Sequence, residues 1–250
     1  MSKEYTKGEN ILMEGIIKAS NGFEKAIVTG ASSGIGKAIA NMLTEVGYDV
    51  YGIGRKFNDT DYNFNKIVLD LLDTKALTAQ IEKLNKAQDI SILVNNAGVG
   101  YYGIHETLSP DEISTMVRTN LEVPLILSNL LVSTLKKNNG FIINISSHTA
   151  TAVNPHGCAY GATKAGLFSF SKSLFEEERK YGLKVIDIQP DMTDTNLYRN
   201  ANFGVAKDVL AYLAPDDVAN AVKYAITQRD GCAITCINLK PQLNRISRNK

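Results

Sequence analysis

The sequence predicts an α/β fold: a doubly wound, mostly parallel sheet of seven strands, covered by helices on both faces. Three observations lead to this prediction. Short apolar runs alternate with longer segments of helical period, each run is too short for a helix, and each is apolar almost throughout. Burial of a parallel strand on both faces explains this continuous apolar character. The runs cover residues 26–29, 50–53, 67–70, 90–95, 141–145, 185–188 and 233–239.

The length and composition fit one domain. The chain has 250 residues, of which 44% are hydrophobic and 21% are charged, and such a chain can bury one sizeable core. We expect the domain to cover residues 25–240, after an N-terminal extension, 1–24, that is either a short helix or flexible. The basic C-terminal tail, 241–250, is too short to indicate binding of nucleic acid or a membrane, and we interpret it as a solvated terminus.

Helix boundaries are marked at two places. Apolar residues recur at helical spacing from Ile35 to Val46, and Gly47 follows as a left-handed cap. Ser109 and Glu112 form a capping-box pattern, with proline between them in the first turn, and this helix is expected to run into Asn120. The polar crossover at residues 58–63 is expected to lack a full helix.

The charge balance and the cysteines exclude several classes of function. Lysine and arginine total 27 against 26 acidic residues, so no general field attracts nucleic acid or anionic lipid. No signal-peptide core and no apolar run of membrane-spanning length is found, so we expect a cytoplasmic protein without a membrane partner. Cys158, Cys232 and Cys236 are expected to be reduced thiols, and no ligand set for a metal accompanies them.

A glycine-rich turn follows the first predicted strand and leads into the first helix. Glycine permits positive φ and leaves room for a pyrophosphate, and the amides of the helix start attract its charge. A purely structural turn is the alternative, and a nucleoside triphosphate loop does not fit because one residue too many precedes Lys37. We therefore expect a dinucleotide cofactor, with contacts from Gly30, Ser32, Ser33, Gly34, Ile35 and Gly36.

The end of the second predicted strand indicates which dinucleotide binds. An acidic residue at this point accepts hydrogen bonds from the free ribose hydroxyls of NAD. The sequence has Arg55 and Lys56 there instead, and no carboxylate. The guanidinium of Arg55 suits a 2′-phosphate, with Lys56 and Ser32 as further contacts, so NADP(H) is expected rather than NAD(H).

Candidate catalytic residues follow the fifth predicted strand. Tyr160 and Lys164 are four residues apart, so on a helix they would project from one face. A cation near a phenol stabilises the phenolate, and Tyr160 could then act as general acid or base on an alcohol or carbonyl. Ser146 and Ser147 end the strand, and from the residues alone either hydroxyl could polarise the substrate.

Taken together, these motifs resemble the short-chain dehydrogenase/reductase family over residues 25–240, and the resemblance implies a Rossmann-type fold. In that family the catalytic serine lies thirteen residues before the tyrosine, which selects Ser147. The resemblance further implies a catalytic tetrad of Asn120, Ser147, Tyr160 and Lys164. In this tetrad Asn120 would hold a water, and Lys164 would also bind the nicotinamide ribose.

The same resemblance implies more cofactor contacts. Asp70 at the end of the third strand would contact the adenine, and the cofactor would also meet Tyr160 and Lys164. The remaining implied contacts are Asn96, Ala97, Gly98, Pro190, Thr193 and Thr195. The sequence departs from the family pattern at Asp191, where a glycine usually follows the proline, and at its C-terminal end, which lacks the usual double glycine.

These observations predict an NADP(H)-dependent oxidoreductase that transfers a hydride between the nicotinamide and a carbonyl or secondary alcohol, with Tyr160 as general acid and base. A cofactor-binding regulatory or scaffold protein without turnover is the alternative. The expected partners are a small carbonyl or alcohol substrate and further copies of the chain, as a homodimer or homotetramer. The roles of His148, His156 and Cys158 stay open.

Overall fold

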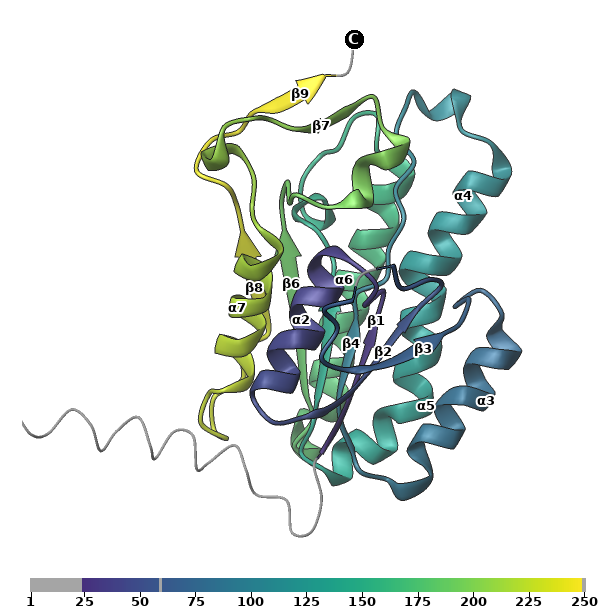
Figure 1. Ribbon diagram of the computed structural model, residues 1–250, viewed down its shortest axis with the longest axis vertical. Helices are drawn as coiled ribbons and strands as arrows, with labels where there is room; N and C mark the ends of the chain where they lie inside the picture. The colour runs from purple at the N-terminus through teal and green to yellow at the C-terminus, as the bar shows by residue number, and fades with distance from the viewer. Residues whose placement is uncertain (1–23, 59, 249–250) are drawn as a thin grey trace, which may run out of the picture.

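The computed structural model describes residues 24–58 and 60–248. Its main sheet has seven parallel strands in the order β3-β2-β1-β4-β5-β6-β8, so the chain doubles back between β1 and β4. This arrangement confirms the predicted doubly wound fold (Figure 1). The strands are β1 (Lys25–Thr29), β2 (Asp49–Gly54), β3 (Asn65–Val68), β4 (Ile90–Asn95), β5 (Phe141–Ile145), β6 (Lys184–Pro190) and β8 (Cys236–Leu239).

At two places a strand stops short of the predicted run, whereas β1, β2 and β6 extend one or two residues beyond theirs. β3 ends at Val68, so Asp70 lies in the turn beyond the strand, where its carboxylate accepts a hydrogen bond of 3.0 Å from the amide of Leu72. β8 begins at Cys236 and not at residue 233, because it pairs only with the second half of β6, from Asp187 to Pro190. In both cases the predicted run extends past the residues that pair with a neighbouring strand of the sheet.

Helices cover both faces of the sheet. α2 (Gly34–Glu45) and α7 (Pro215–Ile226) pack against each other and against one face, where buried side chains such as Ile39 and Val222 meet those of the strands. α3 (Thr74–Leu84), α5 (Val123–Lys137) and α6 (Cys158–Glu178) belong to the opposite face, around Leu77, Leu127 and Leu131. Figure 1 shows these two layers with the sheet between them.

The predicted helix boundaries are confirmed. Gly47, with φ +102°, follows the end of α2. α4 (Pro110–Val117) begins with a capping box, in which Ser109 Oγ accepts from the Glu112 amide at 3.2 Å. A π-helical segment, Arg118–Glu122, joins α4 to α5 and contains the buried Asn120. The π-helical segment therefore contains a residue, Asn120, that the sequence analysis assigned to the catalytic tetrad.

The C-terminal tail is exposed from Asn244 to Ser247, as expected, but it contains a short strand that the sequence analysis did not predict. Residues Ile246–Arg248 form β9, which pairs antiparallel with β7 (Phe203–Val205), and Val205 lies opposite Ile246. This two-stranded sheet lies above the carboxyl ends of the main strands in Figure 1. The prediction for the N-terminal extension concerns residues that lie, apart from Glu24, outside the described part of the chain.

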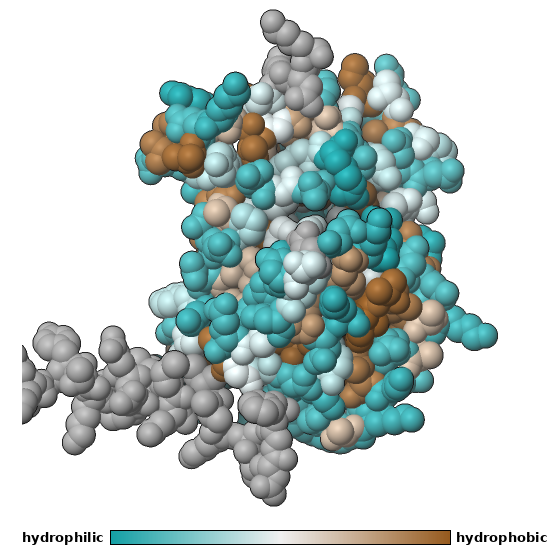
Figure 2. All heavy atoms as spheres, in the orientation of Figure 1, coloured by the Kyte–Doolittle hydropathy of each residue, from teal (hydrophilic) through white to brown (hydrophobic). Residues whose placement is uncertain are grey.

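The surface is mainly polar. In Figure 2 hydrophobic residues form separate groups, one of them at the upper left, where Figure 1 places the segment between β7 and α7. This segment carries Val209 and Leu210, which are 70% and 53% exposed. Within residues 24–58 and 60–248, no helix combines the length and apolar character required to cross a membrane.

Candidate active site

A cleft of about 910 Å³ lies at the carboxyl ends of the main strands and brings most of the predicted site residues together. Three predicted residues, Gly36, Lys56 and Asn120, are not in its lining. The predicted residues that line it are Gly30, Ser32, Ser33, Gly34, Ile35, Arg55, Asp70, Asn96, Ala97, Gly98, Ser147, Tyr160, Lys164, Pro190, Thr193 and Thr195.

The glycine turn leaves no room for a Cβ atom at Gly30 or Gly36. Gly30 and Gly34 have φ +68° and +55°, a backbone conformation that L side chains rarely adopt. A Cβ on Gly30 would lie 2.9 Å from both Ala97 Cα and Asn96 Nδ2. A Cβ on Gly36 would collide with the Gly30 carbonyl and with Asn96, so Gly36 supports the turn from beneath. These contacts leave an open backbone cradle, which fits a pyrophosphate.

Thr29 locks this turn to the neighbouring strand end. Its hydroxyl oxygen accepts hydrogen bonds from the amides of Asn96, at 3.0 Å, and Ala97, at 3.1 Å, and it donates to the Val94 carbonyl at 3.2 Å. Asn96 Nδ2 donates back to the Thr29 carbonyl at 2.9 Å and to the Gly30 carbonyl at 3.3 Å. The two segments that straddle the reversal in strand order are therefore tied directly together. The sequence analysis gave Thr29 no role.

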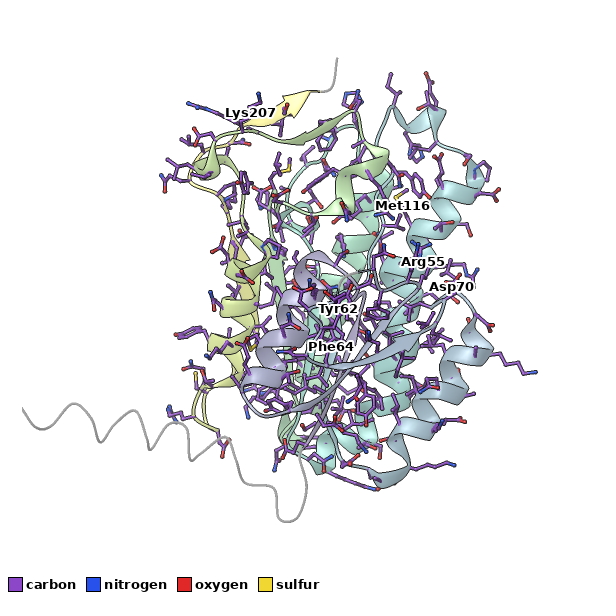
Figure 3. All side chains as sticks on the ribbon, viewed as in Figure 1. Arg55, Tyr62, Phe64, Asp70, Met116 and Lys207 are labelled. Atoms are coloured by element: carbon purple, nitrogen blue, oxygen red, sulfur yellow. The ribbon has the colours of Figure 1, made fainter. Side chains whose placement is uncertain are left out.

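The residues expected to select the dinucleotide lie at one end of the cleft. Arg55 follows β2, is exposed, and lines the cleft together with Ser32 and Asp70. Figure 3 labels Arg55 and Asp70 on the same side of the molecule. The guanidinium is thus available at the end of the cleft where a ribose phosphate would extend from the glycine turn.

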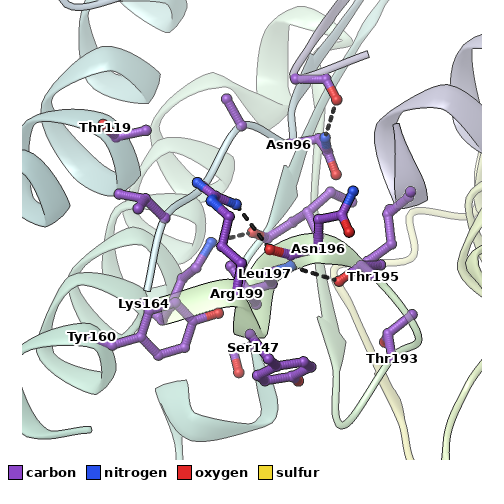
Figure 4. Close-up of a pocket in the computed structure, with 18 of the residues that line it drawn as sticks. Asn96, Thr119, Ser147, Tyr160, Lys164, Thr193, Thr195, Asn196, Leu197 and Arg199 are labelled. Atoms are coloured by element: carbon purple, nitrogen blue, oxygen red, sulfur yellow. Dashed lines mark hydrogen bonds between the residues drawn. The ribbon is translucent and has the colours of Figure 1, made fainter. Parts of the chain in front are cut away.

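The predicted serine and tyrosine face each other across the other end of the cleft (Figure 4). The Ser147 hydroxyl accepts from the Thr149 amide, at 3.1 Å, and from the Thr149 hydroxyl, at 3.0 Å, and its hydrogen-bonding effect lowers the pKa of Tyr160. Tyr160 lies in the first turn of α6 and is only 4% exposed. Two hydroxyls therefore converge on a point where a substrate oxygen can bind.

Lys164 lies one helical turn after Tyr160 on the same face of α6. Its Nζ donates to the Ile145 carbonyl at 2.8 Å and lies 5.8 Å from the centre of the Tyr160 ring. Burial lowers the pKa of Lys164 to about 8, against an opposing effect of the Asp187 carboxylate, which raises it. Near neutral pH the side chain therefore carries its charge beside the tyrosine.

Tyr160 itself differs from the prediction. The sequence analysis expected Lys164 to lower the pKa of this phenol, but burial raises it above its usual value near 10. Hydrogen bonds from Ser147 and from Tyr102 act in the opposite direction and lower this pKa. Desolvation disfavours the phenolate, and the groups around its oxygen offset only part of that cost.

Asn120 is held away from the cleft. Its side-chain oxygen accepts from the Val99 amide at 2.9 Å, and its nitrogen donates to the Val99 carbonyl at 2.9 Å and to Thr163 Oγ1 at 3.1 Å. The residue is completely buried. Asn120 therefore fixes Val99, which lines the cleft, and it joins this segment to α6 next to Lys164.

Ser146 and Ser147 have different partners. Ser146 Oγ donates to the buried carboxylate of Asp187 at 2.5 Å, and Ser171 Oγ lies 3.2 Å from the other carboxylate oxygen. Of these two serines, only Ser147 is among the groups that lower the pKa of Tyr160, which supports its assignment as the catalytic serine. The sequence analysis missed Asp187, although an acidic residue inside a run predicted to be buried was a visible signal.

The substrate side of the cleft contains residues that the sequence analysis did not assign. Tyr102 follows the Asn95 to Gly98 turn, Tyr198 and Arg199 lie in the short helix η6 (Asn196–Asn200), and Ile246 comes from β9. No spacing rule identifies such residues, because they come from three separate segments.

The residues left open have different positions. His156 lines the cleft and has φ +63°, whereas His148 and Cys158 are not among the lining residues. Cys158 is an exposed free thiol. In the described part of the chain, no group of three His, Cys, Asp or Glu side chains is arranged to hold a metal ion.

Comparison with known proteins gives a consistent family. The sequence profile described as short chain dehydrogenase matches residues 24–204. An uncharacterized oxidoreductase of Staphylococcus epidermidis is 31% identical, covering 86% of this chain and 96% of the relative. A 3-oxoacyl-(acyl-carrier-protein) reductase of Escherichia coli is 32% identical, covering 80% of this chain and 88% of the relative.

A solved structure agrees with the sequence matches. A metagenomic short-chain oxidoreductase in complex with NADP superposes with a TM-score of 0.72 at 30% identity, covering 88% of this chain and 98% of the other. The glycine turn and the segment that carries Tyr160 both lie within residues 24–204, which the family profile matches.

Proposed function

This chain is an oxidoreductase of the short-chain dehydrogenase family, and on that premise we propose that it transfers a hydride between NADP(H) and a carbonyl or secondary alcohol carbon, with Tyr160 as general acid and base. The observation that carries the proposal is the convergence of the Ser147 and Tyr160 hydroxyls at one end of a cleft whose other end is the glycine turn. A dinucleotide on the turn would present its reactive ring to these hydroxyls.

In the reduction direction, the substrate oxygen accepts hydrogen bonds from Ser147 and Tyr160. The bound nicotinamide supplies the hydride that adds to the carbonyl carbon. Tyr160 gives its proton to the oxygen as negative charge develops there, so the product is a neutral alcohol and Tyr160 becomes a phenolate. The nearby ammonium of Lys164 stabilises this phenolate, and it also provides a donor for the nicotinamide ribose.

The preference for NADP(H) rests on Arg55. Its exposed guanidinium lines the end of the cleft beyond the glycine turn and can hold a 2′-phosphate. The NADP complex of a relative that is 30% identical supports the same choice. The implied adenine contact at Asp70 and the nicotinamide contacts at Pro190, Thr193 and Thr195 form part of this proposal, since all four line the cleft.

A scaffold protein that binds cofactor without turnover is the alternative. The intact hydroxyl pair and the buried Lys164 favour catalysis, because such groups cost stability and serve no packing purpose. Small-molecule substrates suit the cleft. Assembly as a homodimer or homotetramer and a cytoplasmic location remain predictions.

Cofactor choice is tested by titrating the protein with NADPH and NADH while following nicotinamide fluorescence. We expect NADPH to bind more tightly, and Arg55→Ala to weaken NADPH binding about tenfold while leaving NADH nearly unchanged. Lys75→Ala, which removes an exposed cation that does not line the cleft, is the matched control for loss of a surface charge. Equal losses for both cofactors would remove Arg55 from the proposal.

Turnover is tested with NADPH and a panel of keto acids, keto esters, 3-oxoacyl thioesters, diketones and steroids. Once a substrate is found, Tyr160→Phe is expected to lower kcat by about 10²- to 10⁴-fold while cofactor binding is retained. Normal turnover by this variant would overturn the catalytic assignment. Cofactor binding without turnover of any carbonyl by the wild-type protein would favour the scaffold alternative.

A further inference from the structure

One cation in the cleft has no role in the proposed function. Among the described residues, three lysine or arginine side chains line the cleft: Arg55, Lys164 and Arg199. Arg55 is assigned to the 2′-phosphate, and Lys164 to the tyrosine and the ribose. Arg199 lies in η6 and is exposed, and in Figure 4 its side chain extends from this helix into the pocket. Its guanidinium is the lining cation that still lacks a ligand group.

The guanidinium of Arg199 keeps donors available for a ligand. Its Nη1 donates to the Asn196 carbonyl at 2.9 Å, one turn earlier in η6. Within residues 24–58 and 60–248, no carboxylate forms an ion pair with Arg199. The nearest acidic lining residue in sequence, Asp191, accepts instead from the Met192 amide at 2.9 Å. Arginine has five N–H donors in a planar fork, so the contact with Asn196 leaves the fork able to hold an anion.

The helix η6 extends from the glycine turn to the substrate side of the cleft. Its cap residue, Thr195, lies against the glycine turn, because a Cβ built on Gly34 would be 3.0 Å from Thr195 Cγ2. Its last residue, Asn200, donates to the Gly100 carbonyl at 3.4 Å, in the loop that follows β4. Arg199 directly precedes Asn200 and therefore belongs to the substrate end of the helix, whereas a pyrophosphate on the glycine turn would meet the cap end.

Aromatic rings connect Tyr160 to the segment that carries Arg199. The centre of the Tyr102 ring lies 5.5 Å from that of Tyr160 and 6.2 Å from that of Tyr198, the residue before Arg199. Phe203 completes this cluster, with its ring centre 5.2 Å from that of Tyr102. A substrate whose oxygen is held at Tyr160 would lay its carbon skeleton along these rings. A negatively charged end of the same molecule would then meet Arg199.

We propose that Arg199 binds the carboxylate of the substrate, so that the site takes an oxo acid in reduction and the corresponding hydroxy acid in oxidation. This inference rests on the proposed function and names its substrate class. The arginine fork matches a carboxylate with two parallel hydrogen bonds. The carboxylate takes no part in the bond changes: the hydride still adds to the carbonyl carbon, and the proton still comes from Tyr160. Its contact with Arg199 orients the carbonyl for that transfer.

The test compares each acid with a neutral counterpart of similar shape. The value of kcat/KM with NADPH is measured for a series of oxo acids and for their methyl esters in wild type, Arg199→Gln and Lys207→Gln. Lys207 is the matched control, since it is an exposed cation in the segment after β7 that does not line the cleft (Figure 3). We expect Arg199→Gln to lower kcat/KM for the preferred acid about 10- to 100-fold and to leave that of its ester nearly unchanged. Lys207→Gln should leave both unchanged.

A binding measurement gives a readout without turnover. The NADP⁺ complex of each protein is titrated in a calorimeter with a saturated carboxylic acid, which has no oxo group to reduce, and with its amide. We expect wild type and Lys207→Gln to bind the acid more tightly than the amide, and Arg199→Gln to lose this preference. Arg199→Lys keeps the charge but not the planar fork, so it should retain only part of the preference.

Three results would contradict the inference while leaving the proposed function intact. The first is an equal kcat/KM for acids and esters in wild type, and the second is an equal loss for both in Arg199→Gln. The third is weaker NADPH binding in Arg199→Gln, which would assign the guanidinium to the cofactor pyrophosphate. Failure of the proposed function would appear differently, as unchanged turnover in Tyr160→Phe or as no turnover of any carbonyl, and the calorimetric titration would still report on Arg199.

Discussion

The cofactor half and the substrate half of the cleft are constrained in different ways. The cofactor half is made from backbone: the glycine turn after β1 and the Asn96 to Gly98 segment after β4 approach so closely that no Cβ fits at Gly30 or Gly36. The substrate half is made from side chains on loops, on η6 and on the two short strands β7 and β9. The comparison shows that the backbone site has no space for a Cβ at these two glycines, whereas the side-chain site offers groups that can be changed one at a time.

The largest effect is expected from substitutions in the cofactor half. Gly36→Ala places a Cβ against the Gly30 carbonyl, so the turn must shift. We expect a loss of about 1–3 kcal/mol in the free energy of unfolding and a loss of about a hundredfold in NADPH affinity. Denaturant unfolding and fluorescence titration measure the two quantities.

Gly204→Ala is the matched control in the substrate half. Nothing lies within 4 Å of a Cβ built on Gly204, which is in β7. This variant should change stability by less than about 0.5 kcal/mol and leave NADPH affinity unchanged. Similar losses in both variants would remove the distinction between the two halves.

A smaller effect on NADPH affinity is expected from a substitution at Asp187, whose carboxylate acts on Lys164. The Asp187 carboxylate raises the pKa of Lys164, which burial lowers to about 8. Asp187→Asn removes this charge, so the pKa of Lys164 falls and its ammonium form is lost at a lower pH. If Lys164 binds the ribose as proposed, then as pH rises NADPH affinity should begin to drop at a pH about one unit lower than in wild type.

Ser171→Ala is the control for this measurement, because it removes one hydrogen bond to the same carboxylate and leaves the charge in place. Fluorescence titrations of NADPH across a pH series should show a smaller displacement in Ser171→Ala than in Asp187→Asn. Coincident pH profiles for wild type and Asp187→Asn would mean that the carboxylate only supports the packing of β5, β6 and α6.

The smallest effect is expected at the outer edge of the substrate half. Ile246 lines the cleft from β9 and is 47% exposed. Ile246→Ala should raise KM for an apolar carbonyl about fivefold, which corresponds to about 1 kcal/mol of lost apolar burial, and leave the Kd of NADPH unchanged. Steady-state kinetics and fluorescence titration separate these two effects. A change in the Kd of NADPH would show that β9 also shapes the cofactor half.

The same division explains what could be predicted from the sequence. The strand and helix pattern, the glycine turn and the pair Tyr160 and Lys164 follow local spacing rules, and the structure brings these side chains to one cleft. β7 and β9 have three residues each and pair across more than forty residues of sequence, so no periodic pattern marks them. Tyr102 was missed because its ring meets that of Tyr160 only in the folded chain, which no spacing rule reports. The predicted direction of the pKa of Tyr160 was wrong because sequence spacing does not report burial.

The reversal in strand order between β1 and β4 has a consequence for the lifetime of the protein. A dinucleotide on the glycine turn would touch both the early strands and the late strands, which Thr29 and Asn96 already tie together. Such a ligand binds only the folded chain, so each tenfold excess over its Kd adds about 1.4 kcal/mol to the free energy of unfolding. Resistance to heat and to proteases should therefore follow the supply of nicotinamide cofactor, and a shortage would shorten the time for which the folded molecule survives.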